Sequence, residues 1–304
     1  VASLGIAFGA VFSSGMMEVA RKGIFIPGEF FFNEIMIIFL AVMITDILLL
    51  DFFNTLGMPT STTVSIVFEL LGAAVAMALI KIGADQGSFV DVVKYINTEK
   101  ATEIIFGIIL SVVVAFSVGA LVQYVSRVLL SFDFQKKAKW VGAVFGGIAL
   151  AAITYFIFIK GLQGTEYYAQ IRPLIQGKTL SIVIISFVLW TILSYICVAF
   201  FKLNIYKIII IVGTFALALA FAGNDLVNFI GVPIAAWQSY QAWRGSGIPA
   251  TEFSMDVLSQ KVPTPTMFLI GAGMIMVITL WLSSKAKSVV KTSIDLSSQS
   301  DTKE

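Results

Sequence analysis

The chain has 304 residues, of which 58% are hydrophobic and only 12% are charged, with a formal net charge of +2. Soluble domains carry about 25% charged and roughly 45–50% apolar residues, so this composition excludes a water-soluble globular protein and predicts a membrane protein. The low charge and its scatter along the chain argue against a nucleic-acid partner. Histidine is absent and Cys197 is the single cysteine, which excludes Ser-His-Asp catalysis, histidine metal ligation and an intrachain disulfide.

Long apolar segments follow one another along the chain, and a membrane span needs about 20 such residues. We expect them to be helices, because a lipid-exposed backbone must satisfy its own hydrogen bonds. Their continuous apolar character excludes the alternating pattern of a β-barrel. The expected spans lie near 1–20, 33–57, 58–81, 104–131, 141–160, 180–201, 207–222, 226–243 and 265–283. The fold class is therefore all-α, a polytopic membrane helix bundle.

Two short stretches suggest an internal repeat: SSGMMEVARKGI at 13–24 resembles SSKAKSVVKTSI at 283–294. A chance match in a biased composition is the alternative. Internal repeats are common in secondary transporters and come with broken helices at the substrate site. We expect two homologous repeats, with residues 1–100 in the first, 101–203 as central scaffold helices and 204–304 in the second. Because the chain begins without methionine or a charged leader, we interpret it as an internal part of a longer protein.

The stretch LGMPTSTTVSIVFELLG interrupts the apolar pattern with a proline and a run of hydroxyl residues. Pro59 lacks an N–H and disfavours helix at the residue before it, which predicts a break near Gly57–Pro59. A new helix should start at about residues 60–61, and the N–H groups and dipole at its start favour an anion. Ser61, Thr62 and Thr63 add hydroxyl donors in the same turn. The alternative is that these hydroxyls bond to their own backbone and the proline only kinks the helix.

A second polar stretch, GNDLVN, lies in the apolar region near residue 225. Asp225 and Asn228 are three residues apart and share a helix face. A carboxylate in the bilayer costs about 2.5–3.5 kcal/mol on insertion scales, so it should face a partner or a cavity. Asn224, Asp225 and Asn228 offer the oxygen ligands that suit a hard cation such as Na⁺. The alternative is a capping residue at a helix start.

Three further acids lie within or beside expected spans: Asp46, Asp51 and Glu69. Intramembrane acids are functional candidates by default, and Asp51 and Glu69 are taken as candidate cation-binding residues. A nearby membrane edge or a lysine partner explains these acids equally well.

The two polar motifs together resemble the inorganic phosphate transporter family, the cation-coupled PiT-type permeases. AGNDLVNFIGVPIAA is similar to the family's GANDVANA-like motif, and LGMPTSTTVSIV to its G-[LM]-P-V-S-T-T-H-like motif. The family carries both motifs in each of two halves, which implies that this chain lacks the first ND motif and the second STT motif. It departs from the family at Val64, where histidine is usual, at Thr60, where valine is common, and at Ile6, where some members carry glutamate.

The resemblance implies a secondary active transporter that moves inorganic phosphate with a cation, Na⁺ first and H⁺ second, by alternating access. It implies that Ser61, Thr62, Thr63, Asp225 and Asn228 bind phosphate, that Asn224 and Asp225 bind the cation, and that no other cofactor is needed. It also implies a multi-pass protein of the cell membrane, of the bacterial inner-membrane type, with a homodimer as one arrangement. The alternatives are a symporter of another oxyanion such as sulfate, or a non-transporting membrane scaffold or receptor. A membrane-embedded hydrolase is disfavoured because histidine and paired aspartates are missing, so no enzyme is expected.

Overall fold

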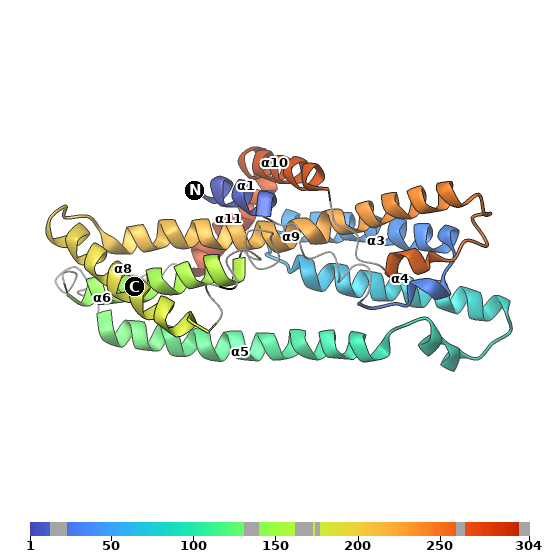
Figure 1. Cartoon of the computed structure of the whole chain (residues 1–304), viewed down its shortest axis with the longest axis horizontal. Coiled ribbons are helices and arrows are strands. Elements are labelled where there is room, and N and C mark those ends of the chain that lie inside the picture. Colours follow the sequence, from blue (N-terminus) through green and yellow to red (C-terminus); the bar gives the residue numbers. More distant parts are fainter. Residues whose placement is uncertain (13–22, 131–139, 162–172, 174–176, 260–264, 298–304) are drawn as a thin grey trace, which may run out of the picture. The chain divides into compact units, whose positions relative to one another are not determined.

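The computed structural model describes residues 1–12, 23–130, 140–161, 173, 177–259 and 265–297 (Figure 1). The chain divides into two compact units, each described by itself. The first holds Val1–Gly15 and Gly107–Gly223, and the second holds Met16–Phe106 and Asn224–Glu304.

The described residues are helical apart from loops and two isolated β-bridges, as the all-α prediction requires. The α-helices are α1 (Ala2–Phe12), α3 (Phe32–Thr55), α4 (Thr62–Ala84), α5 (Thr98–Leu130), α6 (Val141–Tyr155), α8 (Thr179–Ala199), α9 (Ile205–Ser246), α10 (Thr266–Leu282) and α11 (Ser284–Ser297). Short helical turns are η1 (Pro27–Glu29), η2 (Phe89–Lys94), η3 (Phe156–Gly161) and η4 (Met255–Ser259).

Six described helices are long and apolar enough to cross a membrane, and α10 with α11 forms a further pair bent by 73°. The chain is therefore a polytopic helical membrane protein with a broken helix, and the predicted fold class is confirmed. The expected spans at 207–222 and 226–243 were wrong as separate elements, because α9 continues through both as one helix. Asparagine and aspartate keep their backbone N–H groups, so the GNDLVN stretch can stay helical despite its low helix propensity.

In the first unit, α6 packs closely on α8 through a stripe of small residues on α6. Small residues let two membrane helices approach, so that dispersion contacts replace the hydrophobic effect that lipid cannot supply. A Cβ atom added at Gly146 would lie 2.8 Å from the Oγ of buried Ser194, and one at Gly147 would collide with Thr191. In the same unit, a Cβ at Gly9 of α1 would lie 2.5 Å from the carbonyl oxygen of Leu219 on α9.

Gly147→Ala should destabilise the protein by about 1–3 kcal/mol, the usual effect of overpacking a tight contact. The matched control is Gly119→Ala on α5, where an added Cβ meets nothing within 4 Å and the change should be neutral or stabilising by up to about 1 kcal/mol. Thermal unfolding in detergent measures both. Equal melting temperatures for the two variants would contradict the α6–α8 contact.

The core of the second unit lies between α3, α4 and the later part of α9, with loop segments closing one end. Ile35, Leu70 and Val232 are among its fully buried side chains. At the closed end, the Phe32 N–H donates to the Phe253 carbonyl at 2.9 Å, and the rings of Phe32 and Trp243 stack with centroids 4.6 Å apart. These contacts fix the start of α3 against the loop that follows α9.

Lys81 ties the end of α4 to the start of α3. Its Nζ donates to Glu34 Oε2 at 2.9 Å and to the Glu29 carbonyl at 2.8 Å, and it lies 4.6 Å from the ring centroid of Phe31 and 5.4 Å from that of Tyr95. The Lys81 and Glu34 side chains are only 15% and 14% exposed. Charge pairing and the aromatic faces both stabilise the partly desolvated ammonium group.

Lys81→Met should lower the free energy of unfolding by about 2 kcal/mol, since it leaves a largely buried carboxylate without its cation. The double variant Lys81→Met/Glu34→Gln should lose less than the sum of the two single changes, because the second change removes the stranded charge. Melting temperatures of the three variants and the parent give the coupling. If the loss of stability in the double variant equalled the sum of the losses in the two single variants, the two side chains would not interact.

Candidate functional site

The predicted break between α3 and α4 is a helix C-terminus followed directly by a capped helix start. α3 ends at Thr55; the Gly57 N–H donates to the Asn54 carbonyl at 3.1 Å, and the Met58 N–H donates to the Phe53 carbonyl at 3.0 Å. This pattern is a Schellman motif, which needs a left-handed residue, and Gly57 has φ +69°. Pro59 then prevents the helix from continuing, so the break near Gly57–Pro59 is confirmed.

Helix α4 restarts within a residue of the predicted position, with Ser61 as its N-cap. The Val64 N–H donates to Ser61 Oγ at 3.4 Å, while Thr62 and Thr63 form the first turn. The dipole and the first N–H groups of a helix favour an anion at its start. The backbone thus places three of the predicted phosphate-binding residues where an oxyanion is best stabilised.

The two helices form a hairpin, because residues that pair across it run in opposite order. Lys81 of α4 meets Glu34 near the start of α3, and Ser65 of α4 meets Asp46 farther along it. Each arm is long enough to span a membrane. The hydroxyl motif is therefore the turn at one end of a helical hairpin.

Glu69, a predicted cation-binding residue, lies inside this hairpin beside Asp46. The Ser65 hydroxyl lies 2.6 Å from Glu69 Oε1 and 3.4 Å from Asp46 Oδ1. Asp46 is only 3% exposed. The structure thus brings together two acids that the sequence placed on different helices, and it adds a hydroxyl between them.

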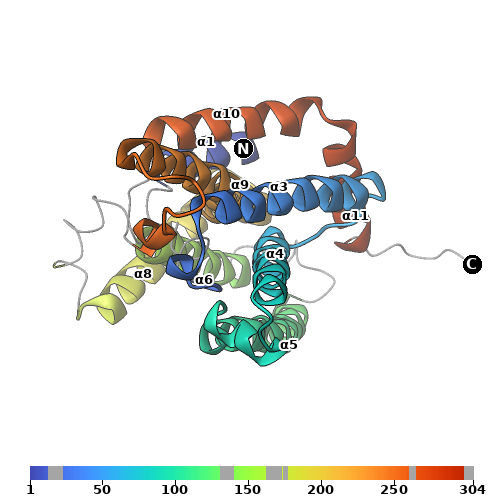
Figure 2. The same cartoon turned by 90° about the vertical axis from the view of Figure 1, so that its right-hand side faces the viewer.

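Asp51, the other predicted cation-binding acid on α3, is exposed and forms an ion pair with Lys285 of α11. Figure 2 shows α11 turning away from the end of α10 toward the end of α3. The lysine partner that the sequence left open as an alternative is present. Asp51 therefore contacts α11 and does not join the Asp46–Glu69 pair, and its predicted role in cation binding stays a prediction.

Gly57 is also a contact point for α11, since a Cβ added there would lie 2.8 Å from Ser288 Oγ. Gly57→Ala should destabilise the protein by about 1–2 kcal/mol, because a left-handed conformation is strained for alanine and the methyl group meets α11. Gly72→Ala in the middle of α4, where an added Cβ meets nothing within 4 Å, is the control. Thermal unfolding compares the two, and an unchanged melting temperature for Gly57→Ala would contradict this packing.

The second motif lies on α9. The backbone of α9 is helical through Asn224, Asp225 and Asn228, but these three side chains lie outside the described part of the structure. Their predicted roles stay predictions. Pro233 also lies inside α9, where it removes one backbone hydrogen bond and its ring crowds the carbonyl four residues earlier.

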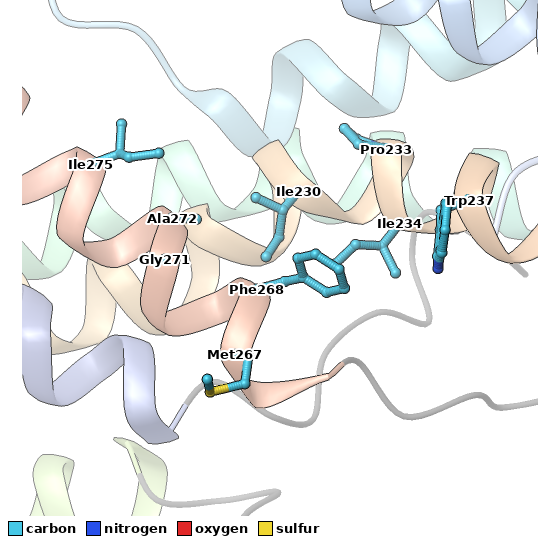
Figure 3. A pocket seen from close by; sticks show the side chains of 9 residues that line it. All are labelled: Ile230, Pro233, Ile234, Trp237, Met267, Phe268, Gly271, Ala272 and Ile275. Atoms are coloured by element: carbon cyan, nitrogen blue, oxygen red, sulfur yellow. The ribbon is translucent and has the colours of Figure 1, made fainter.

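After this motif in the chain, residues of α9 and α10 line an open pocket of about 620 Å³ (Figure 3). Its lining side chains are Ile230, Pro233, Ile234, Trp237, Met267, Phe268, Gly271, Ala272 and Ile275. None of these nine carries a charge or a hydroxyl group. The indole N–H of Trp237 is the one side-chain donor among these nine residues, so the pocket is mainly apolar and is distinct from the hydroxyl motif.

The membrane-spanning helices and the capped break between α3 and α4 define the class: a polytopic membrane protein with a broken, hydroxyl-rich helical hairpin. The chain belongs to the phosphate transporter family, whose model matches residues 1–293. This confirms the resemblance noted in the motifs. The family is one of transporters, so the prediction that the chain is not an enzyme is also confirmed.

A solved structure supports the same fold. The structure described as "The sodium-dependent phosphate transporter" aligns with a TM-score of 0.58 and 15% sequence identity, covering 96% of this chain and 67% of that chain. At this identity the likeness concerns the fold. No curated protein sequence matches the chain.

Proposed function

We propose that this chain moves inorganic phosphate across the membrane together with a cation, by alternating access around the α3–α4 hairpin and α9. The observation that carries the proposal is the start of α4, where Ser61, Thr62 and Thr63 follow a Schellman-terminated helix. Helix N–H groups and hydroxyls provide donors for a tetrahedral oxyanion without a fixed positive charge. Phosphate should leave such a site more easily than it would leave a site built from arginine side chains. A transporter must release its substrate, so this arrangement suits transport.

Asp225 and Asn228 complete the proposed phosphate site, with Asn224 and Asp225 holding the cation. Dianionic phosphate next to a carboxylate is repelled in a medium of low dielectric. A cation between them removes this repulsion, so binding of phosphate and of the cation become linked. Oxygen ligands from Asp and Asn suit Na⁺, which makes Na⁺ the first choice and H⁺ the second. We place the protein in the cell membrane of a bacterium, with a homodimer as the arrangement to test.

Uptake of ³²P-phosphate into proteoliposomes tests this proposal. Uptake should require an inward Na⁺ gradient and should resist competition by sulfate, which has no proton to donate to a carboxylate. Uptake that follows a pH gradient in the absence of Na⁺ would replace Na⁺ by H⁺ as the coupling ion. Sulfate uptake in place of phosphate would overturn the substrate, and the absence of any uptake would favour a scaffold or receptor.

A further inference from the structure

Two carboxylates and one hydroxyl meet between α3 and α4, one turn beyond the hydroxyl motif. Asp46 is 3% exposed and Ser65 is 8% exposed. Ser65 Oγ lies 2.6 Å from Glu69 Oε1 and 3.4 Å from Asp46 Oδ1. Glu69 Oε2 is buried and has no hydrogen-bond partner among the described residues.

The cluster contains two carboxylates that accept hydrogen bonds but only one hydroxyl that can donate one. A serine hydroxyl has one proton and can donate to only one acceptor at a time. The shorter contact assigns that proton to Glu69 and leaves Asp46, which is more than nine-tenths buried, without a donor among the described residues. A buried carboxylate without a donor or a cation is strongly destabilised, so the cluster needs one more positive charge.

Several of the described charged groups on the surrounding helices are already paired with one another. The described ion pairs on elements packed against the hairpin are Lys285 with Asp51 on α11 and α3, Lys81 with Glu34 at the far end of the hairpin, and Lys94 with Asp91 on η2. The described part of α9 in this unit contributes Arg244, near its C-terminal end. None of the described cations contacts Asp46, Ser65 or Glu69.

We propose that Asp46, Ser65 and Glu69 hold one exchangeable proton and relay it between the two acids. With the proton on Asp46, its O–H donates to Ser65 Oγ, and the Ser65 O–H donates to Glu69 Oε1. In the transfer, the Asp46 O–H bond breaks as that proton bonds to Ser65 Oγ, and the original Ser65 proton moves to Glu69. Both hydrogen bonds then point the other way, with the total number of protons and the net charge unchanged.

The relay is joined directly to the start of α4. The Ser65 N–H donates to the Ser61 carbonyl at 3.0 Å, so Ser65 lies one helical turn from the N-cap. Loss of the proton would leave two negative charges, one buried and one partly buried, next to the helix start proposed to hold an anion, and would therefore disfavour anion binding there. The proposed proton site is argued from the hairpin geometry alone. It therefore does not depend on which anion the protein transports.

Infrared difference spectroscopy tests the relay without measuring transport. The purified protein in lipid is stepped through pH while the C=O stretch of protonated carboxyl groups is recorded. We expect one such band in the parent protein and its loss in both Glu69→Gln and Asp46→Asn. In either variant, a single remaining carboxylate can accept the Ser65 proton, so no extra proton is needed. Glu252→Gln, an exposed loop variant, should keep the band.

Both hairpin variants keep the size of the side chain, and circular dichroism checks that they fold. A parent protein with no protonated-carboxyl band, at any pH where it stays folded, would overturn the proposal. A band that persists in both variants would also overturn it, because the proton would then belong to other acids. Because the band is measured without phosphate or a gradient, failure of this test would leave the proposed transport activity standing.

Discussion

Phosphate uptake should weaken about 100-fold or more when Thr62 and Thr63 are both replaced by valine. A hydrogen bond to a charged group contributes about 1.5–3 kcal/mol, and two such bonds together correspond to at least about two orders of magnitude in affinity. Valine has nearly the shape of threonine, so the first turn of α4 should be retained. The apparent KM for phosphate in proteoliposomes is the measurement.

The matched control for this double change is Thr214→Val on α9, whose hydroxyl donates to the carbonyl of its own helix at 2.7 Å. It should leave the KM unchanged. Ser61 is less suitable for the test, because its side chain also caps α4 and loss of an N-cap destabilises a helix by about 1 kcal/mol. If the valine variant retained the parent KM, phosphate would not bind at the start of α4.

Asp225→Asn should abolish cation-driven uptake. The change keeps the size and one oxygen of the side chain but removes the charge that the proposed cation balances. Removing one partner of a buried charge pair costs about 2–5 kcal/mol, which corresponds to at least about a 30-fold loss. The initial rate of uptake under a Na⁺ gradient measures the effect.

Asp85→Asn, at the exposed C-terminal cap of α4, is the control for this change and should transport normally. A further comparison separates the two roles of Asp225. If the asparagine variant bound phosphate as tightly as the parent without Na⁺ but lost its dependence on Na⁺, Asp225 would serve the cation alone. Normal uptake with normal Na⁺ dependence would remove Asp225 from the site.

The break at the hydroxyl motif could be predicted from sequence because its causes are local. Gly57 takes a left-handed conformation that other residues rarely adopt, and Pro59 cannot continue a helix. Ser61 then supplies a side-chain acceptor at the position where a new helix needs one. All three properties belong to neighbouring residues, so they are visible without knowing the fold.

The pairing of acids could not be predicted, because it depends on how two helices pack. Ser65 and Glu69 are four residues apart, so their contact on one helix face could have been read from the spacing. Asp46 reaches them only across the α3–α4 hairpin, and Lys285 reaches Asp51 only because α11 returns to the end of α3. Such contacts follow from the register between helices, which apolar composition does not specify.

In α9 the sequence predicted a break between two helices that the structure does not have. GNDLVN suggested an interruption between two spans, but asparagine and aspartate each reduce the stability of a helix by less than about 1 kcal/mol. A long apolar helix that packs on both sides of such a stretch can tolerate that loss. Polar residues in a span therefore do not by themselves indicate a break in the helix.

The departure at Val64 has a consequence for proton chemistry. With valine in place of the histidine that is usual in the resembling motif, the hydroxyl motif itself carries no titratable side chain. The next residue, Ser65, instead connects this turn to Asp46 and Glu69. If a proton takes part in transport, the hairpin acids are candidates to carry it in addition to Asp225.

Equilibrium binding of ³²P-phosphate to the purified protein, with and without Na⁺, tests the central claim most directly because it needs neither a gradient nor a sealed vesicle. Saturable binding should appear with Na⁺, should fall when Na⁺ is replaced by choline, and should be lost in the Thr62→Val/Thr63→Val variant. Saturable binding that is equal in the parent and in the valine variant would contradict a phosphate site at the start of α4.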